Sequence, residues 1–150
     1  YLAPGRAGQR PVTLVFSADR SQEGIKDGLM NRRTVVAYKD LLIGRPEFLV
    51  PLVKQSVVIK DAHYLESTSV LQVQLENKSS AAMTFRNKTG MSLRNSSDVF
   101  TLPSRGTITI SIRTKERLPS ARLVFEVLNA VQAPDVHPVI TWEYPVTPGK

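Results

Sequence analysis

The sequence predicts an α+β protein that is mostly β, in which an N-terminal βαβ segment leads into an antiparallel β-sandwich of immunoglobulin-like architecture. Two observations support this prediction. Apolar runs in residues 11–38 flank one amphipathic helical stretch, which is typical of strand–helix–strand order. From residue 57 onward, apolar and polar residues alternate with a period of two. We therefore expect a domain boundary near residue 55, with one unit at 1–54 and a second at 55–150.

The first strand and helix of the N-terminal unit are predicted from a change in periodicity. Residues 11–16, PVTLVF, form a short apolar run after a proline and indicate a buried strand. A helix is expected over residues 22–31, with Ser21 as its N-cap. Ile25 and Leu29 stand four apart and define the apolar face by which this helix should pack.

The rest of the N-terminal unit is predicted to complete a parallel pair and then lead to the sandwich. Residues 33–38, RTVVAY, form the next strand, and a strand reached through a helical crossover lies parallel to the first. Residues 41–44, LLIG, form a short return strand. A helix over 47–54 should be short or kinked, because Pro51 lies inside it.

The second unit is predicted to contain seven or eight short strands with turn signals between them. In 107–113, for example, three isoleucines alternate with Thr, Ser and Arg, as expected for a strand with one buried face. A hairpin-type turn is expected at 87–90, NKTG. The expected strands span 57–65, 70–76, 81–86, 91–93, 99–102, 107–113, 122–127 and 140–144.

Composition excludes several classes of function. The chain has no cysteine, which removes disulfides, Cys-ligated zinc and thiol catalysis. Its net charge of +7 is spread evenly, with 10 basic and 6 acidic residues in 1–65 and 10 and 7 in 66–150. The longest basic run is the pair Arg32 and Arg33, whereas nucleic-acid binders concentrate charge on one element. Nucleic acid is therefore not an expected partner.

Neither a membrane span nor a signal peptide is expected in this sequence. No run of about 18 apolar residues occurs. The sequence opens at Tyr1 without an initiator Met, a basic n-region or an apolar h-region. We therefore expect Tyr1 to be an engineered or proteolytic start rather than a native N-terminus.

Candidate metal and catalytic residues are few. Asp61 and His63 share a face if their strand is regular, and two such ligands could open a metal site; the alternative is a solvent-facing strand edge. His137 lies far along the sequence, between prolines in APDVHP, and no Gly-x-Ser-x-Gly elbow accompanies either histidine. We therefore predict no catalytic, cofactor-binding or metal residues in this chain.

Three further patterns have a binding and a structural interpretation. Residues 4–8, PGRAG, could cradle a phosphate but lack the Gly-Lys-Ser/Thr ending, so a loose terminus is expected. Trp142 and Tyr144 could form a sugar-stacking platform or pack in the core of a last strand. Glycosylation sequons begin at Asn77, Asn87 and Asn95, and in a bacterial protein they indicate only polar turns.

Residues 10–44, RPVTLVFSADRSQEGIKDGLMNRRTVVAYKDLLIG, resemble the segment that closes the barrel in the polymerase and histidinol phosphatase (PHP) family, in its secreted bacterial branch. Residues 41–53, LLIGRPEFLVPLV, resemble the link to a C-terminal β-domain in such proteins. The residues that match the family's helix and following strand are Asp19, Arg20, Ser21, Glu23, Ile25, Arg32, Arg33 and Thr34.

The resemblance implies what this chain contributes and what it leaves to its parent protein. The family binds divalent metals through motifs such as His-x-His and Ser-Asp-x-His, and neither motif occurs here. We therefore expect a non-catalytic C-terminal region: residues 1–54 complete a metal-dependent phosphoesterase barrel, and 55–150 brace it. The parent enzyme would hold the metals, and this chain would hold no cofactor.

The resemblance also implies partners and a compartment. The main partner would be the catalytic barrel of the chain's own parent, with a homo-oligomer as the second partner class. The protein would be bacterial and extracytoplasmic, either periplasmic or secreted. The alternative function is a carbohydrate- or protein-binding β-sandwich module; a nucleic-acid binder would rest on charge alone.

Overall fold

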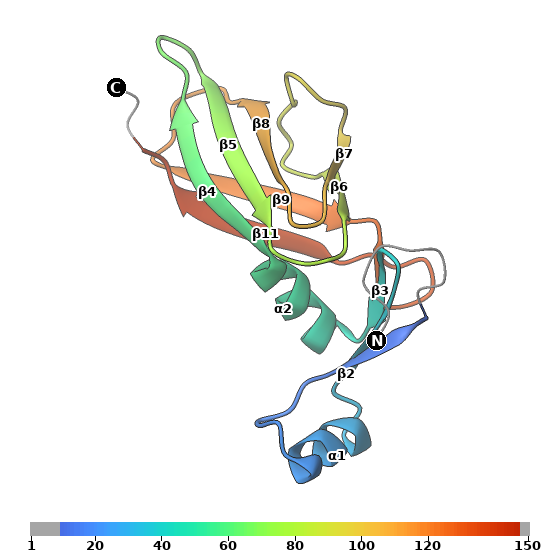
Figure 1. Ribbon diagram of the computed structural model, residues 1–150. Coiled ribbons are helices and arrows are strands. Elements are labelled where there is room, and N and C mark those ends of the chain that lie inside the picture. Colours follow the sequence, from blue (N-terminus) through green and yellow to red (C-terminus); the bar gives the residue numbers. More distant parts are fainter. Residues whose placement is uncertain (1–9, 148–150) are drawn as a thin grey trace.

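Residues 10–147 of the chain are described by a computed structural model, and they fold into three β-sheets and two helices (Figure 1). The helices are α1 (Gln22–Met30) and α2 (Pro46–Ser56). The strands are β1 (Val12–Val15), β2 (Thr34–Tyr38), β3 (Leu41–Gly44), β4 (Val57–Tyr64), β5 (Val70–Asn77), β6 (Met83–Asn87), β7 (Val99–Leu102), β8 (Thr107–Arg113), β9 (Ser120–Val127), β10 (Ala130–Val131) and β11 (Val139–Pro145).

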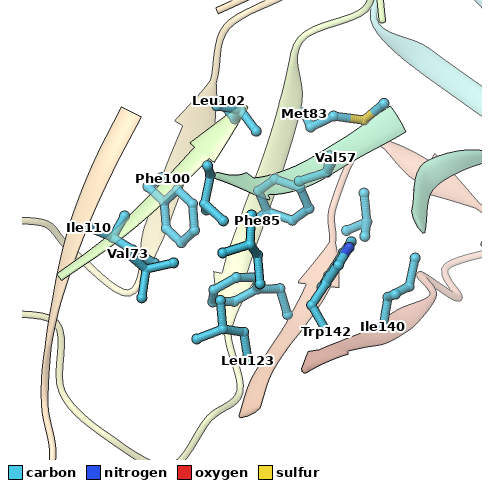
Figure 2. Packing of buried hydrophobic residues seen from close by; sticks show 14 of the residues in the cluster. Val57, Val73, Met83, Phe85, Phe100, Leu102, Ile110, Leu123, Ile140 and Trp142 are labelled. Carbon is cyan, nitrogen blue, oxygen red and sulfur yellow. The ribbon is translucent and has the colours of Figure 1, made fainter. Parts of the chain in front are cut away.

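Seven of these strands form the predicted antiparallel sandwich. One sheet has the order β11-β9-β6-β7 and the other β4-β5-β8. The side chains between the sheets are apolar because alternate residues of each strand point inward. Figure 2 shows Phe85, Phe100 and Trp142 among them, and the rings of Phe85 and Trp142 meet edge to face with centroids 6.0 Å apart. This core confirms the mostly-β, immunoglobulin-like fold class.

The strand expected at residues 91–93 is wrong. Residues 88–98 instead form a long connection between β6 and β7, in which Leu93 makes a single bridge to Ile112 of β8. The predicted NKTG turn lies at the start of this connection, and Gly90 adopts the left-handed conformation with φ of 77°. Met91 and Leu93 alternate with polar residues as in a strand, and Leu93 is buried as a strand residue would be. A single buried residue does not need a continuous row of strand-to-strand hydrogen bonds, so the segment remains a loop.

A second four-stranded sheet, in the order β1-β2-β3-β10, lies at the N-terminal end of the molecule. It joins the sandwich through β10, which pairs in parallel with β3. The expectation that β1 and β2 would be parallel is wrong, because they pair antiparallel, with Thr13 opposite Val36. The predicted order strand–helix–strand is correct, but α1 forms the connection between two antiparallel strands rather than a crossover between parallel ones.

A glycine contact explains the direction of β2. A Cβ on Gly28, near the end of α1, would lie 2.7 Å from Cγ1 of Val15 and 2.9 Å from the carbonyl oxygen of Phe16. The end of the helix is therefore held at the end of β1, and the Phe16 N–H donates to the carbonyl oxygen of Arg33 at 2.8 Å. The C-terminal end of α1 therefore lies next to the C-terminal end of β1. Strand β2 starts from that point and runs antiparallel to β1.

Helix α2 packs against both the N-terminal sheet and the sandwich. It begins with Pro46 in the first turn, where the missing N–H costs no hydrogen bond, and continues through Pro51 to Ser56. Leu49 and Val53 are 0% exposed and belong to the same continuous core as the sandwich. The Trp142 indole N–H of β11 reaches the carbonyl oxygen of Lys54 at 3.4 Å. The division into units at 1–54 and 55–150 stays a prediction.

Candidate functional site

The structure places Asp61 and His63 on a half-exposed sheet edge. Strand β4 is the outer strand of its sheet in the order β4-β5-β8, with a register shift between Ile59 and Asp61. His63 Nδ1 lies 2.6 Å from Asp61 Oδ2, so the two side chains bind each other. Within residues 10–147, no group of three or more His, Cys, Asp or Glu side chains is placed to hold a metal ion.

His137 has a different, structural partner. Its Nδ1 lies 2.8 Å from the carbonyl oxygen of Ala130, which can only accept, so this nitrogen carries the proton. The bond ties the loop before β11 to β10. The structure therefore does not bring the two histidines into one site.

The aromatic pair at the end of the chain does not form a sugar platform. Trp142 is only 7% exposed and packs in the sandwich core. The hydroxyl of Tyr144 donates to the carbonyl oxygen of Lys60 at 3.2 Å. An exposed stacking surface from these two rings is therefore wrong, and the core-packing interpretation is confirmed.

Two of the sequons are turn motifs. Asn77 is buried, and its Oδ1 accepts from the backbone N–H and the hydroxyl of Ser79 at 2.9 and 2.7 Å. Its Nδ2 donates to the carbonyl oxygen of Ala81 at 2.8 Å. Asn87 makes the same contacts with the residues two and four places further on. The polar-turn interpretation is confirmed for both, while the phosphate-cradle candidate at residues 4–8 lies outside the described residues.

Large exposed apolar side chains gather instead in the N-terminal part of the chain. Of thirteen such residues, nine lie between residues 12 and 43 and four in the remainder of the described chain. Isolated exposed apolar residues are ordinary on a protein surface, whereas large contiguous apolar patches are typical of interaction surfaces. The nine residues are Val12, Leu14, Ile25, Leu29, Met30, Val36, Tyr38, Leu41 and Ile43.

Helix α1 exposes the face that was expected to pack. Its buried residue is Gly28, whereas Ile25 and Leu29 face solvent and Met30 is 75% exposed. We call Ile25, Leu29 and Met30 the α1 apolar stripe. The apolar face predicted from Ile25 and Leu29 is present on α1, but residues 10–147 do not bury it. The signal for the observed contact was Gly28, because a close approach to backbone needs a residue without a Cβ.

The start of α1 is fixed by a local polar network. The Ser21 hydroxyl accepts from the Gly24 N–H at 3.0 Å, which confirms the predicted N-cap. The Ser21 hydroxyl and backbone N–H both donate to the Asp19 carboxylate, and these bonds hold the pKa of that carboxyl below its ordinary value. The helix is thus well formed locally even though its apolar stripe has no partner among residues 10–147.

Among residues 10–147, strand β1 has a paired strand on one edge only, and its apolar side chains are partly exposed. It is the end strand of its sheet as described, and its recorded partner is β2. Val12 is 55% exposed, and Leu14 on the same face is also exposed. A valine- and leucine-rich strand with an open edge is normally paired or covered in a finished domain.

The hairpin of β2 and β3 exposes a second apolar surface. Antiparallel register places Val36 opposite Ile43 and Tyr38 opposite Leu41, so all four side chains lie on one side of the sheet. Their exposed fractions range from 37% to 44%. We call these four residues the outer face. The opposite side of the hairpin, with Val35 and Leu42, is buried in the core.

Comparison with known proteins identifies the fold family. The chain matches a family model described as an Ig-like domain, DUF5001, over residues 57–143. This match covers more than half of the chain, so the chain belongs to this family of Ig-like domains. No curated protein matches the chain. Among the described residues, no helix is long and apolar enough to cross a membrane.

A solved structure resembles nearly the whole chain. It is the crystal structure of a two-domain protein from Bacteroides vulgatus ATCC 8482 that contains a predicted PHP-like metal-dependent phosphoesterase. The sequence identity is 27% and the TM-score is 0.76. The similarity covers 91% of this chain but 39% of that one, so this chain spans well under half the length of the protein that it resembles.

Proposed function

We propose that this chain is the non-catalytic C-terminal region of a PHP-like metal-dependent phosphoesterase. In this proposal, residues 1–54 complete the barrel of the catalytic domain and 55–150 brace it as an Ig-like sandwich. The observation that carries the proposal is the similarity of 91% of this chain to 39% of a two-domain protein that contains such a phosphoesterase. The resemblance of residues 10–44 to a barrel-closing segment supports it.

The open edge of β1 and the exposed stripe of α1 support barrel completion. Strands of an α/β barrel are apolar on both sides, because the barrel interior lies on one side and helices on the other. Strand β1 has apolar residues on both sides, with Val12 and Leu14 on one and Val15 on the other. Since the described residues leave this strand and helix uncovered, they fit the last strand and helix of a larger barrel.

The divalent metals of such an enzyme would belong to the catalytic domain. Asp61 and His63 are two ligand types on a sheet edge, and no third joins them within residues 10–147. A catalytic ion that activates water needs several converging ligands. The described residues do not fit a metal cluster, and we assign them no step of the reaction. We further propose that the protein is bacterial and extracytoplasmic, which the family resemblance supports.

An activity assay of the chain beside its whole parent protein tests the proposal. We expect the parent to hydrolyse p-nitrophenyl phosphate or its diester with zinc, manganese or iron, and the 150-residue chain to show no turnover above buffer. A matched sample of the chain with His63→Ala serves as a control for adventitious metal. Turnover by the chain that survives repurification and disappears in the His63 variant would refute the proposal, as would a parent reading frame without a phosphoesterase domain.

A further inference from the structure

The outer face of β2 and β3 exposes apolar side chains to solvent. Antiparallel sheets that face water normally carry polar side chains there. The eight strand residues on this side of the small sheet include no charged side chain, and four of them form the outer face. The eight are Thr13, Val15, Thr34, Val36, Tyr38, Leu41, Ile43 and Val131. The nearest recorded charge is Lys39 of the β2–β3 turn, whose Nζ lies 5.4 Å from the centre of the Tyr38 ring.

This surface is held in place by the rest of the protein. Strand β3 pairs with β10, and the Leu42 N–H donates to the carbonyl oxygen of Asn129 at 2.9 Å. The Asn129 amide donates to the carbonyl oxygen of Asp40, in the turn between Tyr38 and Leu41. The outer face is therefore preorganised, and a partner that binds it loses little conformational entropy.

From these observations we infer that the outer face docks against the phosphoesterase domain of the same polypeptide and sets its orientation on the sandwich. The inference rests on the proposed function and adds a second contact, distinct from the β1 edge. Because Val36 lies opposite Thr13 of β1, the outer face continues directly from the strand that would complete the barrel. A domain joined through β1 is tethered beside this face, and tethering raises its effective concentration to about the millimolar range.

Hydroxyl-radical footprinting of side chains tests the contact, with Tyr38 as the probe. In the 150-residue chain, Tyr38 should react quickly and buried Tyr64 slowly. In the intact two-domain protein, the rate at Tyr38 should fall several-fold toward that of Tyr64, while exposed Leu118 in the sandwich reacts equally in both proteins. An unchanged rate at Tyr38 would overturn the inference.

Matched variants separate this contact from the proposed function. Ile43→Lys in the intact protein should restore fast reaction at Tyr38, whereas Val139→Lys, at an exposed apolar residue of β11, should leave Tyr38 protected. If β1 amides are protected in the intact protein but Tyr38 is not, the inference fails and the proposed function stands. If neither is protected, both fail. Protection of Tyr38 that appears in the isolated chain as its concentration rises would assign the face to a second copy and contradict the inference.

Discussion

Asn129 shows how one side chain fixes the relation between the two parts of the fold. Its Nδ2 donates to the carbonyl oxygens of Asp40 and Ala82, and its Oδ1 accepts from the Thr84 N–H at 2.9 Å. The β2–β3 turn, the approach to β6 and the β9–β10 connection therefore meet at one amide. An aspartate has the same shape but no donor to offer the two carbonyl groups.

We expect Asn129→Asp to lower the free energy of unfolding by about 1–3 kcal/mol, because two carbonyl oxygens lose their donor and face a carboxylate. Asn95→Asp, the same change in an exposed loop, should stay within about 0.5 kcal/mol of the parent. Urea titration followed by the fluorescence of Trp142, the single tryptophan, measures both variants. Equal stability of the two variants would show that the amide does not join the sheet to the sandwich.

At the scale of elements, α2 contributes two fully buried residues to the core. It packs against β2, β3, β4 and β11, so it covers the gap between the small sheet and the sandwich (Figure 1). Leu49 and Val53 lie one turn apart and are both fully buried, as a period near 3.6 residues requires. Pro51 lies between these two residues in the sequence and is exposed.

Truncating that pair should destabilise the whole chain rather than the helix alone. We expect Leu49→Ala to lower the free energy of unfolding by about 2–5 kcal/mol, since it leaves a cavity in the shared core. Gln55→Ala, at an exposed position of the same helix, should change it by less than about 0.5 kcal/mol. Thermal unfolding by circular dichroism measures both. A Leu49→Ala variant that melts like the parent would mean that α2 is not part of the core.

The sequence predicted most elements because their periodicity records which side is buried. Residues 70–76 alternate in sequence, and Leu71, Val73 and Leu75 are all buried in β5. Strand direction leaves no such record, and the antiparallel β1–β2 pair depends on a contact at Gly28 that periodicity does not show. Strand β10 has two residues, too few for any period. For the candidate site, the sequence identifies the apolar residues of β1 and α1. It does not predict that these residues are exposed among residues 10–147.

Over the whole molecule, exposed apolar residues are concentrated in residues 12–43, whereas charged residues are spread along the chain. The sandwich buries its aromatic core, whereas β1, α1 and the outer face remain open among the described residues. Fully burying a large apolar side chain contributes about 1.5–3 kcal/mol. The nine residues are between 37% and 75% exposed, so covering them would contribute a fraction of that amount at each position. A catalytic domain seated on this end would recover that contribution, which is the central claim of the proposed function.

Amide hydrogen exchange at β1 and α1, compared between this chain and its intact parent protein, tests that claim most directly. Backbone amides of residues 12–15 and 22–30 should exchange much more slowly in the parent, because β1 gains a neighbouring strand and α1 gains cover for its stripe. Amides of β5 and β9, inside the sandwich, should exchange equally in both proteins and serve as the internal control. Equal exchange at β1 and α1 in the two proteins would contradict the account, because it would show that no catalytic domain completes itself on this end of the chain.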